Sequence, residues 1–353
     1  MKITFKKATA VVAVFATVIS CAVGLTSCGD KNKTVLNVYN VGDYIDEEVL
    51  DIFEKENPDI KVNYETFYTN EEMYIKVSNN SSAYDVVVPS DYMVERMISE
   101  NLLNEINYDN VPNIKNIGKQ YLNQPYDEGN KYSVPYMWGT MGILYNKKMV
   151  KEPVTSWKIL WDKKYKDNIF MLDSERDSTA IAMKMLGYSM NSSDDKELAE
   201  AQNALIEQKD LVLAYCGDEV KDKMIAGEGA MTIAWSGDAY FCIAENSDLA
   251  YAIPEEGSNL WFDSLVIPKT SKHQKQAEKF INFMCRPDIA KKNAEYIGYS
   301  TANEAARELL DDDVKNDELR YPDLNTLQNM EVFKYDKALS KKISDIWLQV
   351  KMK

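Results

Sequence analysis

Acidic side chains, most of them beside aromatic ones, follow several short apolar runs of the sequence. These clusters are Asp43-Tyr44, Ser90-Asp91-Tyr92, Arg176-Asp177, Trp235-Ser236-Gly237-Asp238 and Trp261-Phe262-Asp263. A carboxylate accepts charge-assisted hydrogen bonds from an ammonium group, and a Trp or Tyr ring face attracts a cation by about 0.5–2 kcal/mol. The residue types therefore indicate a site for a protonated amine on an alkyl chain.

The aspartates next to predicted helices also have a structural explanation, because aspartate is a common helix cap. We favour the cap role for Asp91, weigh cap and ligand roles evenly for Asp177, and note that Asp238 can cap the helix after it. Ser90 can itself be an N-cap residue. The strand-end position alone does not decide between these roles.

Asp263 is the residue that a structural role explains least well. Trp235 and Trp261 can be ordinary core residues, as most tryptophans are. If residues 261–263 are extended, however, Trp261 and Asp263 face the same side. A carboxylate on a run that leads into a buried strand is costly without a partner, so Asp263 points to a ligand.

The sequence carries no recognisable catalytic motif. The one histidine, His273, lies among polar residues and is expected to be exposed, and no G-x-S-x-G, P-loop or H-E-x-x-H pattern is present. Asp311-Asp312-Asp313 lacks the alternation and glycine of a calcium loop. We expect no enzyme, metal or cofactor. The 56 acidic residues leave an extracellular hydrolase with paired carboxylates as the weakest alternative.

Short apolar runs alternate with amphipathic stretches along the chain, which predicts an α/β fold with largely parallel sheets flanked by helices. The predicted strands lie at 35–40, 60–64, 85–89, 168–172, 211–215, 231–235, 251–253 and 265–267, and the clearest helices at 196–208, 274–284 and 335–353. Ligands of open α/β sheets bind beyond the carboxyl ends of the strands. That rule brings the acidic clusters to a common edge.

The amino terminus has the order of a secretory signal peptide. Lys2, Lys6 and Lys7 precede an apolar run over 9–23, and Leu25-Thr26-Ser27-Cys28 closes it. The last four residues resemble the lipobox of bacterial lipoproteins, in which the peptide is cut before a cysteine that carries the lipid. We therefore assign 1–27 to a lipoprotein signal peptide and Cys28 to the lipid anchor, which implies an extracytoplasmic protein held at the cell membrane.

The balance of charges excludes one class of partner. The net charge is −15, and removing the leader with its three lysines and no acid leaves −18. Nucleic-acid binding requires basic surface, whereas an acidic surface speeds the arrival of a cationic solute. Cys216, Cys242 and Cys285 show neither a disulfide framework nor a zinc spacing.

The chain resembles the spermidine/putrescine-binding proteins of polyamine ABC transporters. The matching stretches span the mature chain in order: 36–44, 83–90, 132–139, 155–157, 184–189, 261–265, 281–283, 286–288 and 297–299. The resemblance implies two lobes of a type II periplasmic-binding-protein fold with a ligand cleft between them. It also implies delivery of a polyamine to a membrane permease served by an ATPase subunit, and we expect a monomer.

The resemblance also implies which residues bind the ligand. The family's positions fall on Tyr44, Ser90, Tyr92, Asp177, Trp235, Trp261, Asp263 and Tyr299. Asp43 and Asp238 match acids of the putrescine-preferring branch. Three positions depart from the family: Val41-Gly42 replaces an aromatic corner, Ser174 replaces an acid of the spermidine-preferring branch, and Phe333 replaces a glutamine. We therefore expect putrescine or another short diamine to be favoured, and keep another small organic cation or an amino-acid-like solute as the alternative ligand.

A mature chain of about 326 residues exceeds the usual size of one core. No low-complexity linker divides it, which favours lobes joined by crossing strands, and the best candidates for these strands are 138–142 and 261–266. We predict the first lobe at 34–139 plus 265–320 and the second at 140–264 plus 321–353.

Overall fold

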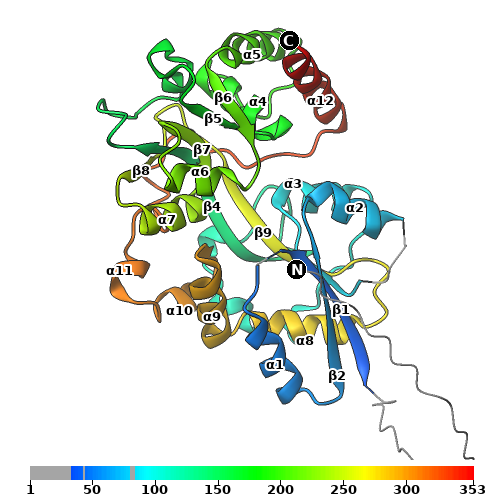
Figure 1. Cartoon of the computed structure of the whole chain (residues 1–353). Helices are drawn as coiled ribbons and strands as arrows, with labels where there is room; N and C mark the ends of the chain where they lie inside the picture. The colour runs from blue at the N-terminus through cyan, green and yellow to red at the C-terminus, as the bar shows by residue number, and fades with distance from the viewer. Residues whose placement is uncertain (1–32, 43, 80–83) are drawn as a thin grey trace, which may run out of the picture.

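The computed structural model describes residues 33–42, 44–79 and 84–353, and Figure 1 shows them as two lobes joined by long strands. Each lobe has its own apolar core. The first core runs from Leu36 to Trp138 and again from Trp261 to Tyr321, whereas the second lies between Met141 and Leu249. The predicted α/β class is confirmed, and the two cores show that it is divided between two lobes.

The first lobe is built on parallel strands that helices cover. Its strands are β1 (Thr34–Val41), β2 (Ile60–Phe67), β3 (Val86–Val87) and β10 (Ser300–Thr301). Its helices are α1 (Glu47–Glu56), α2 (Asn70–Ser78), α3 (Asp91–Ser99), α8 (Gln274–Met284), α9 (Pro287–Ile297), α10 (Glu304–Arg307) and α11 (Asp312–Lys315). β1 pairs in parallel with both β2 and β3, so the carboxyl ends of these strands meet at one edge.

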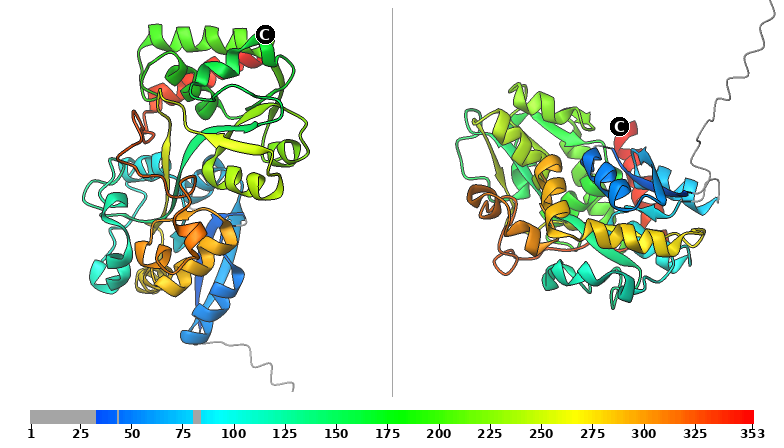
Figure 2. Two further views of the ribbon diagram at one scale, coloured as in Figure 1. Left: turned by 90° about the vertical axis from the view of Figure 1, so that its left-hand side faces the viewer. Right: turned by 90° about the horizontal axis from the view of Figure 1, so that it is seen from below.

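The second lobe repeats this plan. Its strands are β5 (Ile169–Leu172), β6 (Val212–Cys216), β7 (Met231–Trp235) and β8 (Leu249–Ala252). Its helices are α4 (Glu175–Met185), α5 (Asp195–Lys209), α6 (Val220–Ile225), α7 (Ser236–Glu245) and α12 (Lys337–Met352). β5 is parallel to β6 and β7, and α12 packs on α4 and α5 (Figure 2).

Local signals explain where these elements begin. Asp46 caps α1 by accepting a hydrogen bond from Glu48 N, and Asn57 ends the helix before Pro58. Helix α8 begins and ends as predicted, and its N-cap residue, His273, is half-exposed. Nδ1 of His273 lies 3.3 Å from a carboxylate oxygen of the buried Asp85. His273 therefore contacts a buried acid, although its position among polar residues predicted exposure alone.

Two strands connect the lobes (Figure 1). β4 (Ser133–Asn146) pairs antiparallel with β9 (Leu260–Val266) from Ser133 to Thr140 and then with β7 from Met141 to Tyr145. β4 thus changes sheets between Thr140 and Met141. A third crossing follows Tyr321, where the chain returns to the second lobe and Glu331 pairs with Asn259.

The strand pairing shifts one predicted lobe boundary. β9 pairs along its whole length with the first-lobe half of β4, and Phe262 packs with Tyr121 and Tyr126 in the first core. Residues 260–264 therefore lie on the first lobe's sheet, although the predicted division has them in the second lobe. β9 coincides with 261–266, one of the two stretches expected to cross between the lobes.

Candidate functional site

Asp263 lies where three segments of the first lobe meet. Its carboxylate accepts hydrogen bonds from the Tyr44 hydroxyl at 2.6 Å and from the Ser90 hydroxyl at 2.7 Å. Tyr44 follows β1, Ser90 follows β3, and Asp263 is on β9. Each carboxylate oxygen can accept more than one hydrogen bond, so this acid can also receive an ammonium group.

The hydroxyls around Asp263 are themselves held in place. The Asn70 side chain donates to Ser90 Oγ and accepts from Ser90 N, both at 3.0 Å. Tyr136 donates to the backbone carbonyl of Tyr44 at 2.9 Å. Burial raises the pKa of Asp263, and the bonds from Tyr44 and Ser90 oppose that rise. Burial thus disfavours the charged form of Asp263, and a cation placed beside it would favour that form.

Aromatic rings form a wall beside Asp263. The Tyr299 ring centroid lies 5.7 Å from that of Tyr44 and 5.4 Å from that of Trp261. Trp261 faces this wall while Phe262, the next residue, packs into the core. The alternation predicted for 261–263 is therefore present, and the wall can cover the methylenes of an alkyl chain.

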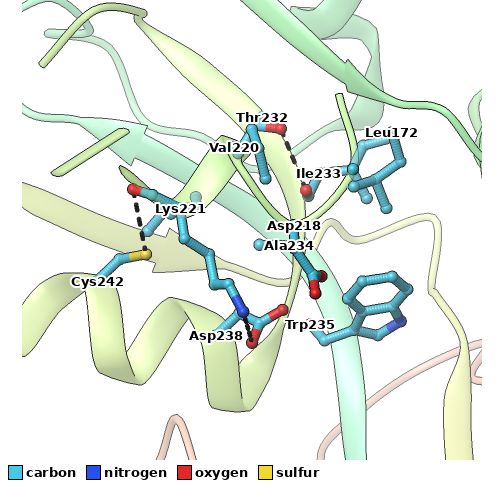
Figure 3. A pocket seen from close by; sticks show the side chains of 12 residues that line it. Leu172, Asp218, Val220, Lys221, Thr232, Ile233, Ala234, Trp235, Asp238 and Cys242 are labelled. Atoms are coloured by element: carbon cyan, nitrogen blue, oxygen red, sulfur yellow. Dashed lines mark hydrogen bonds and ion pairs between the residues drawn. The ribbon is translucent and has the colours of Figure 1, made fainter. Parts of the chain in front are cut away.

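Asp238 brings a second carboxylate to the wall from the other lobe. The Tyr299 hydroxyl donates to Asp238 Oδ1 at 2.9 Å, and the Lys221 ammonium lies 3.6 Å from the same oxygen. Figure 3 shows Lys221 pointing at Asp238, with Trp235 lining the same small cavity of ≈ 10 Å³, which is room for at most one water. Burial raises the pKa of Asp238, while Lys221 and Tyr299 lower it.

The two lobes are in close contact at this point. A Cβ added to Gly237 would stand 1.6 Å from the Tyr299 ring, so only glycine allows this approach. Trp235 packs against the cores of both lobes. The acids Asp263 and Asp238 thus come from opposite lobes and meet at one interlobe contact, linked through Tyr44 and Tyr299.

Asp91 does not cap α3, contrary to the role we favoured. Its buried carboxylate accepts hydrogen bonds from Phe262 N at 3.0 Å and Tyr92 N at 2.6 Å, and burial raises its pKa to about 7. The N-cap residue is Ser90, whose hydroxyl is used by Asp263 instead. Asp91 therefore fixes β9 against α3 and so positions the residues on either side of Phe262.

Tyr92 and Asp177 form a second group at the lobe interface. Tyr92 donates to Glu71 at 3.1 Å, and the Arg176 guanidinium lies 3.2 Å from the centre of the Tyr92 ring. Asp177 stands in the first turn of α4, where its carboxylate accepts from the N-cap residue Ser174 at 2.6 Å. Asp177 is thus part of a capping pair, and Asp238, in the first turn of α7, is not a cap.

Two predicted residues, Asp43 and Cys28, lie outside the described part of the chain. The structure brings together Tyr44, Ser90, Trp235, Asp238, Trp261, Asp263 and Tyr299, with Tyr92 and Asp177 beside them. Among residues 33–42, 44–79 and 84–353, no cluster of three His, Cys, Asp or Glu side chains suits a metal, and no helix is long and apolar enough to cross a membrane.

Sequence reasoning missed four residues that shape the site: Asn70, Tyr136, Gly237 and Lys221. Tyr136 and Gly237 lay within stretches already singled out, but Asn70 and Lys221 carried no local signal. Their roles come from contacts between segments far apart in the sequence, such as Asn70 with Ser90.

Comparisons with known proteins identify the family of this chain. Residues 48–322 match the family described as bacterial extracellular solute-binding protein. The spermidine/putrescine-binding periplasmic protein of Escherichia coli is 38% identical and the match covers 88% of this chain and 89% of the relative.

Two solved structures have the same architecture over nearly their whole length. The substrate-binding protein PotD of a spermidine/putrescine ABC transporter from Streptococcus pneumoniae is 44% identical, with a TM-score of 0.82 over 91% of this chain and 99% of that one. The TpPotD lipoprotein of Treponema pallidum is 26% identical, with a TM-score of 0.80 over 91% and 100%. The chain therefore belongs to the bacterial extracellular solute-binding protein family and has its two-lobed, type II periplasmic-binding fold.

Proposed function

We propose that this chain is the solute-binding component of an ABC importer and that its ligand is a polyamine, with putrescine preferred. The observation that carries the proposal is the pair of partly buried acids, Asp263 and Asp238, set on opposite lobes with Tyr44, Trp261 and Tyr299 between them. The relatives named above as spermidine/putrescine-binding proteins support it.

In this proposal each end of the ligand binds a different acidic residue. One ammonium binds Asp263, where the Tyr44 and Ser90 hydroxyls already orient the carboxylate. The methylenes lie along Trp261 and Tyr299. The other ammonium reaches Asp238, in place of the contacts now made by Lys221 and Tyr299. Asp43 and Trp235 complete the proposed putrescine-binding set, and Tyr92 and Asp177, which the family resemblance also assigns to the ligand, lie at its edge in contact with Arg176 and Ser174.

Titration calorimetry against a small ligand panel tests the proposal. Putrescine and spermidine should bind, whereas γ-aminobutyrate and glucose should not. Asp263→Asn should weaken putrescine binding by roughly 30-fold or more, because it removes a desolvated charge partner. Asp345→Asn, an exposed acid on α12, is the matched control and should bind like the wild type. Binding of γ-aminobutyrate without putrescine would favour the amino-acid-like alternative.

We propose further that the two lobes close around the ligand as one monomer. The lobes are 34–139 plus 260–320 and 140–259 plus 321–353, with the predicted boundary moved to the start of β9. Light scattering coupled to gel filtration should give the mass of one chain with and without putrescine.

The membrane anchor is proposed from the sequence. The Leu25-Thr26-Ser27-Cys28 pattern follows the apolar leader, and a lipidated Cys28 would hold the protein near its permease and ATPase partners. Mass spectrometry of the protein from its native membrane should find a lipid on Cys28, and Cys28→Ala should release the protein. An unmodified Cys28 would contradict the anchor and leave ligand binding untouched.

A further inference from the structure

The positively charged side chain of Arg176 lies at the interface between the lobes. Its guanidinium, from the first turn of α4 in the second lobe, lies 3.2 Å from the centre of the Tyr92 ring and 5.1 Å from that of Phe333. Tyr92 belongs to α3 in the first lobe. Arg176 thus occupies the face of an aromatic ring, the kind of surface that attracts a ligand ammonium.

The surroundings of Arg176 keep it charged and in place. Burial alone would lower the pKa of Arg176, but Tyr92 and Asp177 outweigh that effect, so the pKa is raised. Tyr92 is fixed by its hydrogen bond to Glu71 and by packing against Ala180, Met190 and Phe333 of the second lobe. The arginine and the ring therefore form one rigid unit across the cleft.

This unit lies next to the Asp263 site. Ser90, which bonds Asp263, and Tyr92, which carries Arg176, are two residues apart at the start of α3. Between them lies the buried Asp91, whose pKa is raised by burial and by the charge of Asp263 and lowered by that of Arg176. Arg176 also lines a cavity of ≈ 640 Å³, together with Tyr92, Ser174 and Phe333. Through Tyr92, this cavity begins two residues along the chain from Ser90, which bonds Asp263.

We propose that Arg176 is a specificity-determining residue that limits the ligand to a short diamine. Its guanidinium occupies the Tyr92 face and repels any ammonium that extends past Asp263 toward the cavity. A third amine, or the far amine of a long diamine, has no place to bind while Arg176 is there. This inference rests on the proposed function, since it concerns the length of the amine taken by the same site.

A purely structural role for Arg176 makes a different prediction. If the contact with Tyr92 only stabilised the closed lobes, its loss would weaken every ligand by the same factor. If Arg176 selects for length, its loss changes the ratio between ligands. The ratio of the dissociation constants for different ligands therefore distinguishes the two roles.

The experiment measures Kd by calorimetry for putrescine, spermidine and 1,8-diaminooctane. Wild type should bind putrescine at least tenfold more tightly than either longer amine. Arg176→Met and Arg176→Gln, which remove the charge, should tighten binding of both longer amines about tenfold and change putrescine less than threefold. Arg176→Lys, which keeps a charge, should retain the wild-type preference.

Each outcome decides the question. An unchanged ratio in the neutral variants, or an equal loss for all ligands, overturns the role of Arg176. A wild type that binds spermidine as tightly as putrescine also overturns it, even if neither neutral variant folds, while leaving polyamine binding intact. A wild type that binds none of the three amines instead contradicts the proposed function itself.

Discussion

At the scale of single residues, the behaviour of Asp263 follows from what surrounds its carboxylate. Two hydroxyls give the acid a fixed orientation, and no lysine, arginine or histidine of the described residues forms an ion pair with it. Asp238 differs, because Lys221 and Tyr299 already contact it. We expect Asp263 to supply most of the ligand's binding energy and Asp238 to contribute to the discrimination between ligands.

The raised pKa values of Asp263 and Asp238 predict a pH dependence of binding. Burial favours the protonated form in the free protein, whereas a bound ammonium favours the ionised form. The pKa is therefore lower in the complex, so binding releases protons and putrescine affinity falls as pH drops through the free-protein pKa. The fall should begin well above the value of about 3.9 for an exposed aspartate.

Calorimetry between pH 8 and pH 5, in buffers of different ionisation enthalpy, measures both the affinity and the protons released. Asp263→Asn should show a weaker affinity with a flatter pH profile. An affinity that stays constant down to pH 4 would rule out this linkage.

The individual residues also show how much of the site can be predicted from the sequence. The strand-end rule and the two-residue alternation correctly grouped Tyr44, Ser90, Trp261 and Asp263, because both depend only on local geometry. The rule could not tell a cap from a ligand residue: Asp91 turned out to pin β9, and Asp177 to pair with Ser174. Those outcomes depend on which distant backbone groups lie nearby.

At the scale of elements, the site is made by the ends of helices and strands that approach one another across the cleft. The first turn of α7 brings Gly237 and Asp238 to Tyr299, and the start of α3 brings Ser90 to β9. Most strands and the long helices were predictable from their periodicity. The crossing strands β4 and β9 contain the stretches 138–142 and 261–266 that were expected to cross, but their pairing partners are fixed by tertiary contacts that the sequence does not show.

Gly237→Ala should hinder the approach of the two lobes. The added Cβ would stand 1.6 Å from Tyr299 Cδ1, so the ring would have to move. We expect putrescine affinity to fall about tenfold or more with little change in melting temperature, because the clash acts across the cleft rather than in a core. The double variant Gly237→Ala/Tyr299→Ala should bind no worse than Tyr299→Ala alone. Additive losses would show that the clash is not with Tyr299.

The segment after Tyr321, which is the third to cross between the lobes, is held to the second lobe by an ion pair. Lys184, 4% exposed, contacts Glu331 and donates to the carbonyl of Asn329 at 2.8 Å. Lys184→Met should lower the free energy of unfolding by about 2–4 kcal/mol, because it removes the charge partner of Glu331, which keeps only the hydrogen bonds from Ser189 and Asn191, and leaves the Asn329 carbonyl without its donor. Urea denaturation measures this loss against Lys341→Met, an exposed lysine on α12. A loss equal to that of the control would contradict the fastening role.

At the scale of the whole molecule, two lobes with separate cores meet through three crossing segments and the acid and aromatic cleft. The composition predicted two domains and an acidic surface suited to a cation. It did not place the boundary at β9, because the sequence does not show the antiparallel pairing with β4 that puts this strand on the first lobe's sheet. The contact between Gly237 and Tyr299 implies that a ligand enters only when the lobes separate.

Ligand-coupled closure should be visible in solution. A ligand that touches both lobes favours the closed arrangement by its differential affinity for it. Small-angle scattering should show a smaller radius of gyration with saturating putrescine than without it, and Asp263→Asn should not respond at the same concentration. Identical wild-type profiles would argue against hinge closure.

The location of bound putrescine tests the central claim most directly. A crystal structure of the complex should place one nitrogen about 2.8 Å from the Asp263 carboxylate and the other beside Asp238, with the carbon chain along Trp261 and Tyr299. Putrescine bound outside this cleft, or with neither nitrogen on these acids, would contradict the account.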